Sequence, residues 1–217
     1  SFSKEITGSL MLVAILGNTS FMGIPIVNAY MGESAIPYVL VYDQLGTFIA
    51  LAIYGTFIAS YYSSKNQITF KIITLKVLTF PPFISLVAAL FLMGVEFNPI
   101  LSKVLASFSS TIVPMALVAV GLQLQFKLPK EDLKPFSIAL VIKLIIAPIF
   151  AIIICKIFSW DNEVSVVSIM ESAMAPMITA GAIASMAGLA PRLSSAIVGY
   201  GILISFITTA ILFKLIN

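Results

Sequence analysis

The chain has 217 residues, of which 60% are hydrophobic and only 10% are charged. A soluble domain carries about 25% charged residues, so this sequence lacks the polar side chains that would cover a water-facing surface. Its few cations are dispersed, which excludes a nucleic-acid-binding patch, and Cys155 is the only cysteine, which excludes an intramolecular disulfide. The composition instead predicts an integral membrane protein with the lipid bilayer around it.

Long apolar segments follow one another along the chain, separated by short polar turns. Each is long enough to cross about 30 Å of hydrocarbon as a helix, which takes about 20 residues. None shows the period-two alternation of a β-strand. The sequence therefore predicts an all-α, polytopic transmembrane helix bundle of about seven helices, at residues 6–30, 36–62, 68–95, 100–124, 133–158, 164–187 and 193–216.

Basic residues predict the orientation of the bundle, because cytoplasmic loops are enriched in Lys and Arg. With seven crossings, one face receives seven basic side chains and the other receives three. We expect the richer face to be cytoplasmic, with the N-terminus of this chain inside a plasma (cell inner) membrane and the C-terminus outside. Lys143 is left deep within a helix. The richer face carries Lys4, Lys65, Lys71, Lys127, Lys130, Lys134 and Arg192, and the other face carries Lys103, Lys156 and Lys214.

The first and sixth segments each contain proline and polar residues in the middle of the span, at residues 17–25 (GNTSFMGIP) and 171–179 (ESAMAPMIT). Proline removes a backbone N–H and clashes with the carbonyl one turn back. Asn18 lies about 20 Å from the start of the first helix, and Pro176 lies about 20 Å from the start of the sixth. Because these helices start on opposite faces, we expect two broken helices that cross near the midplane. Ordinary kinks are the alternative, since Pro and Gly are common in membrane helices.

The two breaks are five helices apart, and an odd offset reverses the direction of the chain. This relation is typical of an inverted repeat. Residues 68–217 are then a complete five-helix repeat, whose broken helix is 164–187. Residues 1–62 are the last two helices of a preceding repeat, whose broken helix is 6–30. On this interpretation three further helices, roughly 90–100 residues, precede Ser1.

Several motifs resemble the auxin efflux carrier family, within the bile acid, arsenite and riboflavin transporter superfamily. The resemblance covers essentially the whole chain. It implies a 5+5 inverted-repeat transporter fold, of which this chain lacks the first three helices, with the two broken helices crossing beside the substrate. It also implies export or uptake of organic anions such as auxin or dicarboxylates. The matching stretches are residues 17–25, 42–47 (YDQLGT), 113–116 (VPMA) with Gly121, and 171–176 (ESAMAP), together with Lys143 five residues before Pro148.

Polar residues at the breaks are the candidate substrate-binding residues. Freed N–H groups at the start of a half-helix carry positive partial charge and suit a carboxylate. Side-chain amides and hydroxyls add further donors, although hydrogen bonding within or between helices is the alternative use for them. The candidate substrate-binding residues are Asn18, Thr19, Ser20, Gly23, Pro25, Pro176 and Thr179.

Asp43, Gln44 and Glu171 lie about two turns into their helices and are the ion-coupling candidates. A carboxyl group in hydrocarbon is by default a functional hypothesis, since it can carry a proton or coordinate sodium. Acids near the outer interface are the alternative. Lys143 can steer an anion, or it can snorkel or pair between helices. No cofactor and no metal site are predicted.

These features together predict a secondary active transporter for a small organic anion, and not an enzyme. The chain has no histidine and no Gly-x-Gly-Asp motif, which excludes His-dependent serine catalysis within the membrane. A retinal protein needs a lysine in the middle of a helix, usually the last one. The last segment has only Lys214, at its end, which argues against this class of protein. A channel or sensor built on the same fold is the alternative function, because half-helices that meet at the midplane also build pores. The sequence leaves the oligomeric state open, a homodimer included.

Overall fold

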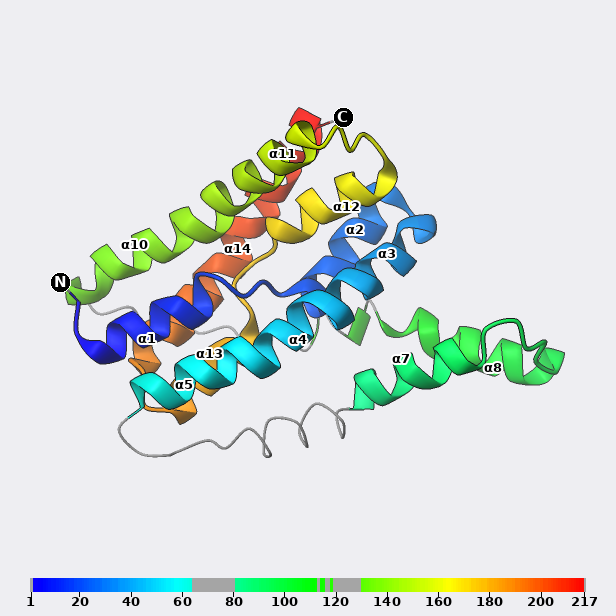
Figure 1. Cartoon of the computed structure of the whole chain (residues 1–217), viewed down its shortest axis with the longest axis horizontal. Coiled ribbons are helices and arrows are strands. Elements are labelled where there is room, and N and C mark those ends of the chain that lie inside the picture. Colours follow the sequence, from blue (N-terminus) through cyan, green and yellow to red (C-terminus); the bar gives the residue numbers. More distant parts are fainter. Residues whose placement is uncertain (1, 64–80, 113, 116–117, 119–129, 217) are drawn as a thin grey trace.

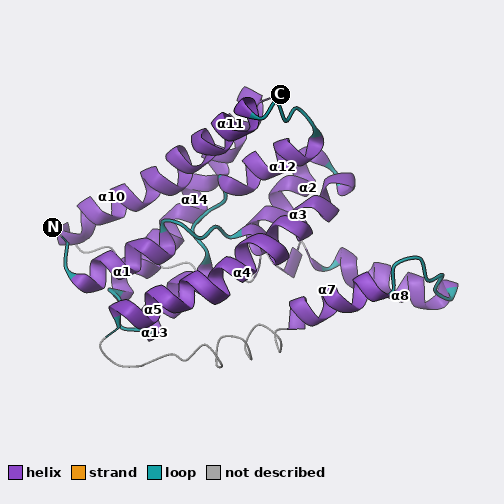
Figure 2. Ribbon diagram, viewed as in Figure 1, coloured by secondary structure: helices purple, strands orange, loops and turns teal. Residues whose placement is uncertain are grey.

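The computed structural model describes residues 2–63, 81–112, 114–115, 118 and 130–216, and these residues are almost entirely helical (Figures 1 and 2). No strand occurs in this part of the chain, where the only β-type pairing is one isolated bridge between Gly17 and Pro176. The all-α bundle that the composition and segment lengths predict is confirmed. The predicted segments 68–95 and 100–124 lie partly outside the described residues.

Three continuous helices of the described chain are long and apolar enough to cross a membrane. The first, Glu33–Tyr62, comprises η2 (Glu33–Ala35), α3 (Ile36–Val41), η3 (Tyr42–Thr47), α4 (Phe48–Ala50), η4 (Leu51–Gly55) and α5 (Thr56–Tyr62). The second, Lys130–Ile157, comprises η5 (Lys130–Asp132), α10 (Leu133–Val141), η6 (Ile142–Ile146) and α11 (Ala147–Ile157). The third is α14 (Pro191–Ile216). Their bounds lie within three residues of the predicted segments.

The two segments that the sequence predicts to break, 6–30 and 164–187, form broken helices. The first consists of α1 (Lys4–Val13), η1 (Thr19–Gly23) and α2 (Ile24–Met31), and the second of α12 (Glu163–Ser172) and α13 (Ile178–Met186). Polar residues cap the starts of α1 and α12: Ser3 accepts from the Ile6 N–H, and Asn162 forms a reciprocal capping box with Ser165. Such caps satisfy backbone donors that have no partner inside the helix.

Two further helices, α7 (Pro81–Phe91) and α8 (Pro99–Ser110), extend away from the rest of the bundle (Figure 1). The α8 helix begins at Asn98, whose side chain accepts from the Ile100 N–H, and Pro99 occupies the first helical position. Proline is favoured there because its missing N–H has no helical partner in any case.

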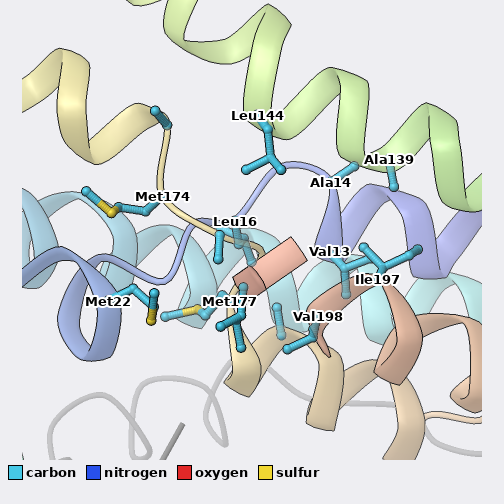
Figure 3. Close-up of a cluster of buried hydrophobic side chains, with 14 of the residues drawn as sticks. Val13, Ala14, Leu16, Met22, Ala139, Leu144, Met174, Met177, Ile197 and Val198 are labelled. Carbon is cyan, nitrogen blue, oxygen red and sulfur yellow. The ribbon is translucent and has the colours of Figure 1, made fainter. Parts of the chain in front are cut away.

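The core surrounds the place where the two broken helices meet. Figure 3 shows side chains from α1, α10, α14 and both breaks packed against one another. The outer surface is apolar as well: Phe150 on α11 and Ile207 on α14 are 62% and 64% exposed. Apolar side chains on both sides of a helix are typical of a membrane span, where lipid covers the outer side.

Candidate functional site

The two breaks cross each other as short antiparallel extended segments. The Asn18 N–H donates to the Ala175 carbonyl at 2.8 Å, and the Met177 N–H donates to the Leu16 carbonyl at 2.9 Å. The bridge pairs Gly17 with Pro176, and each of these is the thirteenth residue after the first residue of its own half-helix, Lys4 or Glu163. The breaks therefore meet at matched depth from opposite directions, and Figure 2 shows both loops in the middle of the bundle. This confirms the predicted crossing.

Local sequence explains why the helices open at these points. Pro25 has no N–H to return to the preceding turn, and the Gly23 N–H instead reaches five residues back to the Asn18 carbonyl at 3.1 Å, which makes η1 a wide π-type turn. On the other helix, the ring of Pro176 packs against Gly201 of α14. A Cβ atom on Gly201 would lie only 2.5 Å from the proline Cδ, so the last helix must carry a glycine where the break passes it.

Asn18 stands at the crossing and is only 2% exposed. Its side-chain oxygen accepts from the Phe21 N–H at 3.2 Å and so caps the helical turn that follows. The amide nitrogen of the side chain has no hydrogen-bond partner. One expectation needs correction: the backbone N–H of Asn18 is not free for a ligand, because it pairs with Ala175 across the crossing.

Asp43 accepts hydrogen bonds from the other polar side chains of the first break. Its Oδ1 accepts from the Thr19 hydroxyl at 2.5 Å and from the Ser20 hydroxyl at 2.6 Å, and its Oδ2 accepts from the Gln44 amide at 2.6 Å. All the oxygens of this buried carboxyl group are therefore engaged. The hydroxyls of Thr19 and Ser20, predicted as substrate donors, are bound to Asp43. The side-chain oxygen of Gln44 has no partner.

Glu171 has quite different surroundings. It is fully buried near the end of α12, and neither carboxyl oxygen has a hydrogen-bond partner. A Cβ atom on Gly23 would overlap both oxygens. The carboxyl group of the second broken helix thus rests directly on the backbone of the first, and only glycine leaves room for it.

Lys143 reaches the crossing from the second long helix. Its ammonium group donates to the Ser172 carbonyl at 2.9 Å, at the last residue of α12, and lies beside Gly17 of the first break. A cation is favoured there because the C-terminus of a helix carries negative partial charge. Lys143 sits in the wide turn η6, which ends just before Pro148, a residue that has no N–H to close a normal turn. Burial of 96% of this side chain rules out snorkelling to the interface.

The remaining predicted site residues fall into two groups. Gly23, Pro25 and Pro176 are buried at the crossing, whereas Thr179 is exposed in the first turn of α13. No side chain caps the start of α13, so its first N–H groups stay available.

Two groups at the crossing, Gly201 and the Ser172 carbonyl, were not predicted from the sequence. The glycine pair Gly199 and Gly201 in the last segment could have indicated a close helix contact. Nothing in the sequence indicates that the Ser172 carbonyl binds Lys143. The VPMA stretch with Gly121 lies largely outside the described residues.

A cavity of about 390 Å³ lies between α11, α12 and Tyr42 of η3. Trp160 and Asn162, in the exposed turn between α11 and α12, line one part of it. Tyr42, the neighbour of Asp43 in the chain, and Ser168, one turn before Glu171, line another. The cavity therefore extends from the turn between α11 and α12 toward the buried acids.

Comparison with known proteins gives the family. Residues 1–213 match the family described as membrane transport protein. A protein of Methanocaldococcus jannaschii named an uncharacterized transporter is 29% identical over 175 residues, which cover 78% of this chain and 56% of that relative. Another such transporter, from Methanothermobacter thermautotrophicus, is 23% identical over 184 residues, which cover 82% of this chain and 58% of the relative.

The chain thus spans a little over half the length of these curated relatives. Both relatives carry transporter names, and the family match extends over nearly all of the sequence. It includes both broken helices and the polar cluster between them. The match confirms the resemblance to the auxin efflux carrier family, and this chain belongs to the membrane transport protein family.

Proposed function

We propose that the protein is a secondary active transporter that moves a small organic anion, such as a carboxylate, by alternating access. The substrate binds at the crossing of the two broken helices. The observation that carries this proposal is the Asn18 side chain, which is buried at the crossing and whose amide donor has no partner. A buried donor without a partner is unfavourable by about 1–3 kcal/mol, and an anionic ligand would supply the acceptor.

The donors that remain at the crossing favour an anion over a cation or a neutral solute. The Lys143 ammonium group has three N–H donors, of which Ser172 uses one. The first turn of α13 offers backbone N–H groups and the positive end of a helix. Together with the Asn18 amide, these groups come from three separate elements. A carboxylate can accept from several of them at once, because each of its oxygens has two lone pairs.

Substitution of Asn18 tests this proposal. Asn18→Ser keeps an oxygen that can cap the Phe21 N–H and removes the amide donor. Asn18→Ala removes both the cap and the donor. We expect both variants to bind radiolabelled malate or indole-3-acetate more weakly by about 1–3 kcal/mol, roughly 5- to 150-fold in affinity. Only Asn18→Ala should also lose stability, by about 1 kcal/mol for a missing cap.

The matched control is Asn162→Ala, which removes the cap of α12 at its exposed end. This control should lower stability without lowering affinity. Affinity and the midpoint of thermal unfolding are measured on the same preparation of each variant. A well-folded Asn18→Ser protein with unchanged affinity for every carboxylate that the wild type binds would remove Asn18 from the site.

A further inference from the structure

The carboxyl group of Glu171 is the least compensated polar group in the described chain. It is 0% exposed, and both of its oxygens lack a hydrogen-bond donor. An ionised carboxylate that is buried without a hydrogen-bond donor is strongly disfavoured, because it loses its hydration. In this position the group needs either a proton or a bound cation.

A metal cation fits these surroundings poorly. Hard cations such as Mg²⁺ or Ca²⁺ take about six or more oxygen ligands. The described residues contain no group of three or more acidic, Cys or His side chains that could hold a metal ion. The oxygens of Asp43 are engaged by Thr19, Ser20 and Gln44. The Lys143 ammonium group, at the same end of α12, would repel a second cation.

Three neighbouring ionisable groups interact electrostatically with the Glu171 carboxyl. They are Tyr42 and Asp43 from η3 and Lys143 from η6. Asp43 repels the ionised carboxylate, and Lys143 attracts it more weakly than Asp43 repels it. A proton removes the repulsion and needs no additional ligands. The elements packed against α12 carry further ionisable side chains. Cys155 is buried and Tyr200 is half-buried, and the others are exposed: Tyr30, Glu33, Tyr38, Lys156, Arg192 and Lys214.

The position of Glu171 connects proton binding to the crossing. Its carboxyl group rests on Gly23 of the first broken helix, although it belongs to the second. The cavity between α11 and α12 leads from the exposed turn at Trp160 and Asn162 toward Ser168, one turn before Glu171. Any movement that separates the two broken helices changes the surroundings of this carboxyl group and thereby its affinity for a proton.

We propose that Glu171 is the residue that takes up and releases a proton during transport, and that Asp43 is a positioning residue. The proton comes from the water phase, bonds to one carboxyl oxygen of Glu171 and leaves as H⁺ when the crossing rearranges. This inference rests on the proposed transport function, which it deepens by naming the coupling ion and its residue.

Infrared difference spectroscopy of the full chain in lipid nanodiscs tests the inference without any substrate. A protonated carboxyl group has a C=O stretching band that an ionised one lacks. We expect the wild type to show such a band and to lose it as the pH is raised. Glu171→Gln should lack this band, whereas Asp43→Asn should keep it. Glu163→Gln, a matched change at the exposed start of the same helix, should also keep it.

Glu171→Gln could lose the band simply because it does not fold. Glu171→Asp separates the two causes, because it keeps a carboxyl group and should give a shifted band. A band that persists unchanged in Glu171→Gln would overturn the proposal. So would a wild type without the band whose carboxylate signal responds to added sodium chloride but not to potassium chloride, because that result assigns a metal cation to the site.

Transport separates the failure of this inference from the failure of the proposed function. In liposomes, wild-type uptake of radiolabelled malate or indole-3-acetate should depend on an imposed pH gradient, and Glu171→Gln should lose that dependence. Wild-type exchange that takes place but ignores the pH gradient refutes proton coupling and leaves the carrier intact. A wild type that exchanges no carboxylate, but whose Glu171 band titrates, refutes the proposed function and leaves the proton site standing.

Discussion

At the scale of single residues, two buried acids of similar predicted role have opposite surroundings. Asp43 accepts three hydrogen bonds, all from side chains, whereas Glu171 accepts none. Hydrogen bonds to a charged acceptor contribute about 1.5–3 kcal/mol each, so Asp43 is suited to hold the first break in place. Both were equal candidates for ion coupling in the sequence, and only their partners distinguish them.

Asp43→Asn should therefore act on stability. An asparagine offers one acceptor oxygen and places an N–H₂ group among the Thr19, Ser20 and Gln44 donors. We expect a loss of about 1.5–3 kcal/mol, seen as a lower midpoint of thermal unfolding in detergent. Asp161→Asn, in the exposed turn after α11, is the control and should leave the midpoint unchanged. An Asp43→Asn protein of normal stability whose transport has altered ion dependence would instead make Asp43 an ion ligand.

At the scale of elements, wide turns in the first and second long helices carry two of the three buried ionisable side chains at the crossing. Asp43 lies in η3 and Lys143 in η6, and both side chains reach a break in a different helix. A wide turn holds an extra residue and locally changes which side of the helix a side chain faces, and such turns are frequent at functional sites. Lys143 in particular links three elements, because it lies in η6, binds the end of α12 and touches Gly17.

Lys143→Met keeps most of the length of the side chain and removes its charge and its donors. Loss of the charge-assisted bond to Ser172 should lower stability by about 1.5–3 kcal/mol. If Lys143 also attracts the substrate, the affinity for malate or indole-3-acetate should fall as well. Lys156→Met, an exposed change on the same long helix, is the control for both measurements. Unchanged affinity in a folded Lys143→Met protein would limit this residue to capping α12.

At the scale of the whole molecule, the antiparallel crossing is the feature that organises the bundle. Two half-helices of ten residues each, α1 and α12, run toward each other and stop at the same depth. Unwound backbone within a membrane is tolerated only where protein or a cavity surrounds it. Here the two breaks satisfy part of each other's backbone through two hydrogen bonds. The arrangement fits an inverted repeat, which stays a prediction together with the orientation in the membrane.

The orientation is tested by labelling. Lys130 and Asp161 are exposed just before and just after α10–α11, so they lie at opposite ends of one long helix. In a Cys155→Ala background, Asp161→Cys should react with a membrane-impermeant maleimide added to intact cells. Lys130→Cys should react only after the cells are opened, and the cysteine-free background should not react at all. Reaction of both sites from outside would contradict the seven-to-three charge argument.

The sequence by itself determined the class of protein, the bounds of the three long helices and the places where two other helices break. These features depend on the composition and on local chemistry. A run of apolar residues has few alternatives in lipid, and Pro25 or Pro176 disturbs its own helix whatever surrounds it. The matched depth of Asn18 and Pro176 could be counted along the chain, so the crossing was predictable as well.

Only the tertiary structure decided what each polar side chain does. Asp43 and Glu171 are both carboxylic acids about two turns into a helix, and apart from Gln44, which donates to the adjacent Asp43, their local sequence does not show what surrounds them. Two of the three donors to Asp43, Thr19 and Ser20, lie more than twenty positions away in the sequence. The Gly23 backbone, against which the Glu171 carboxyl group lies, is farther away still. The carbonyl bound by Lys143 is likewise a backbone group that any residue would supply. Hydrogen bonding at the crossing depends on how separate helices pack, and packing is a property of the assembled bundle.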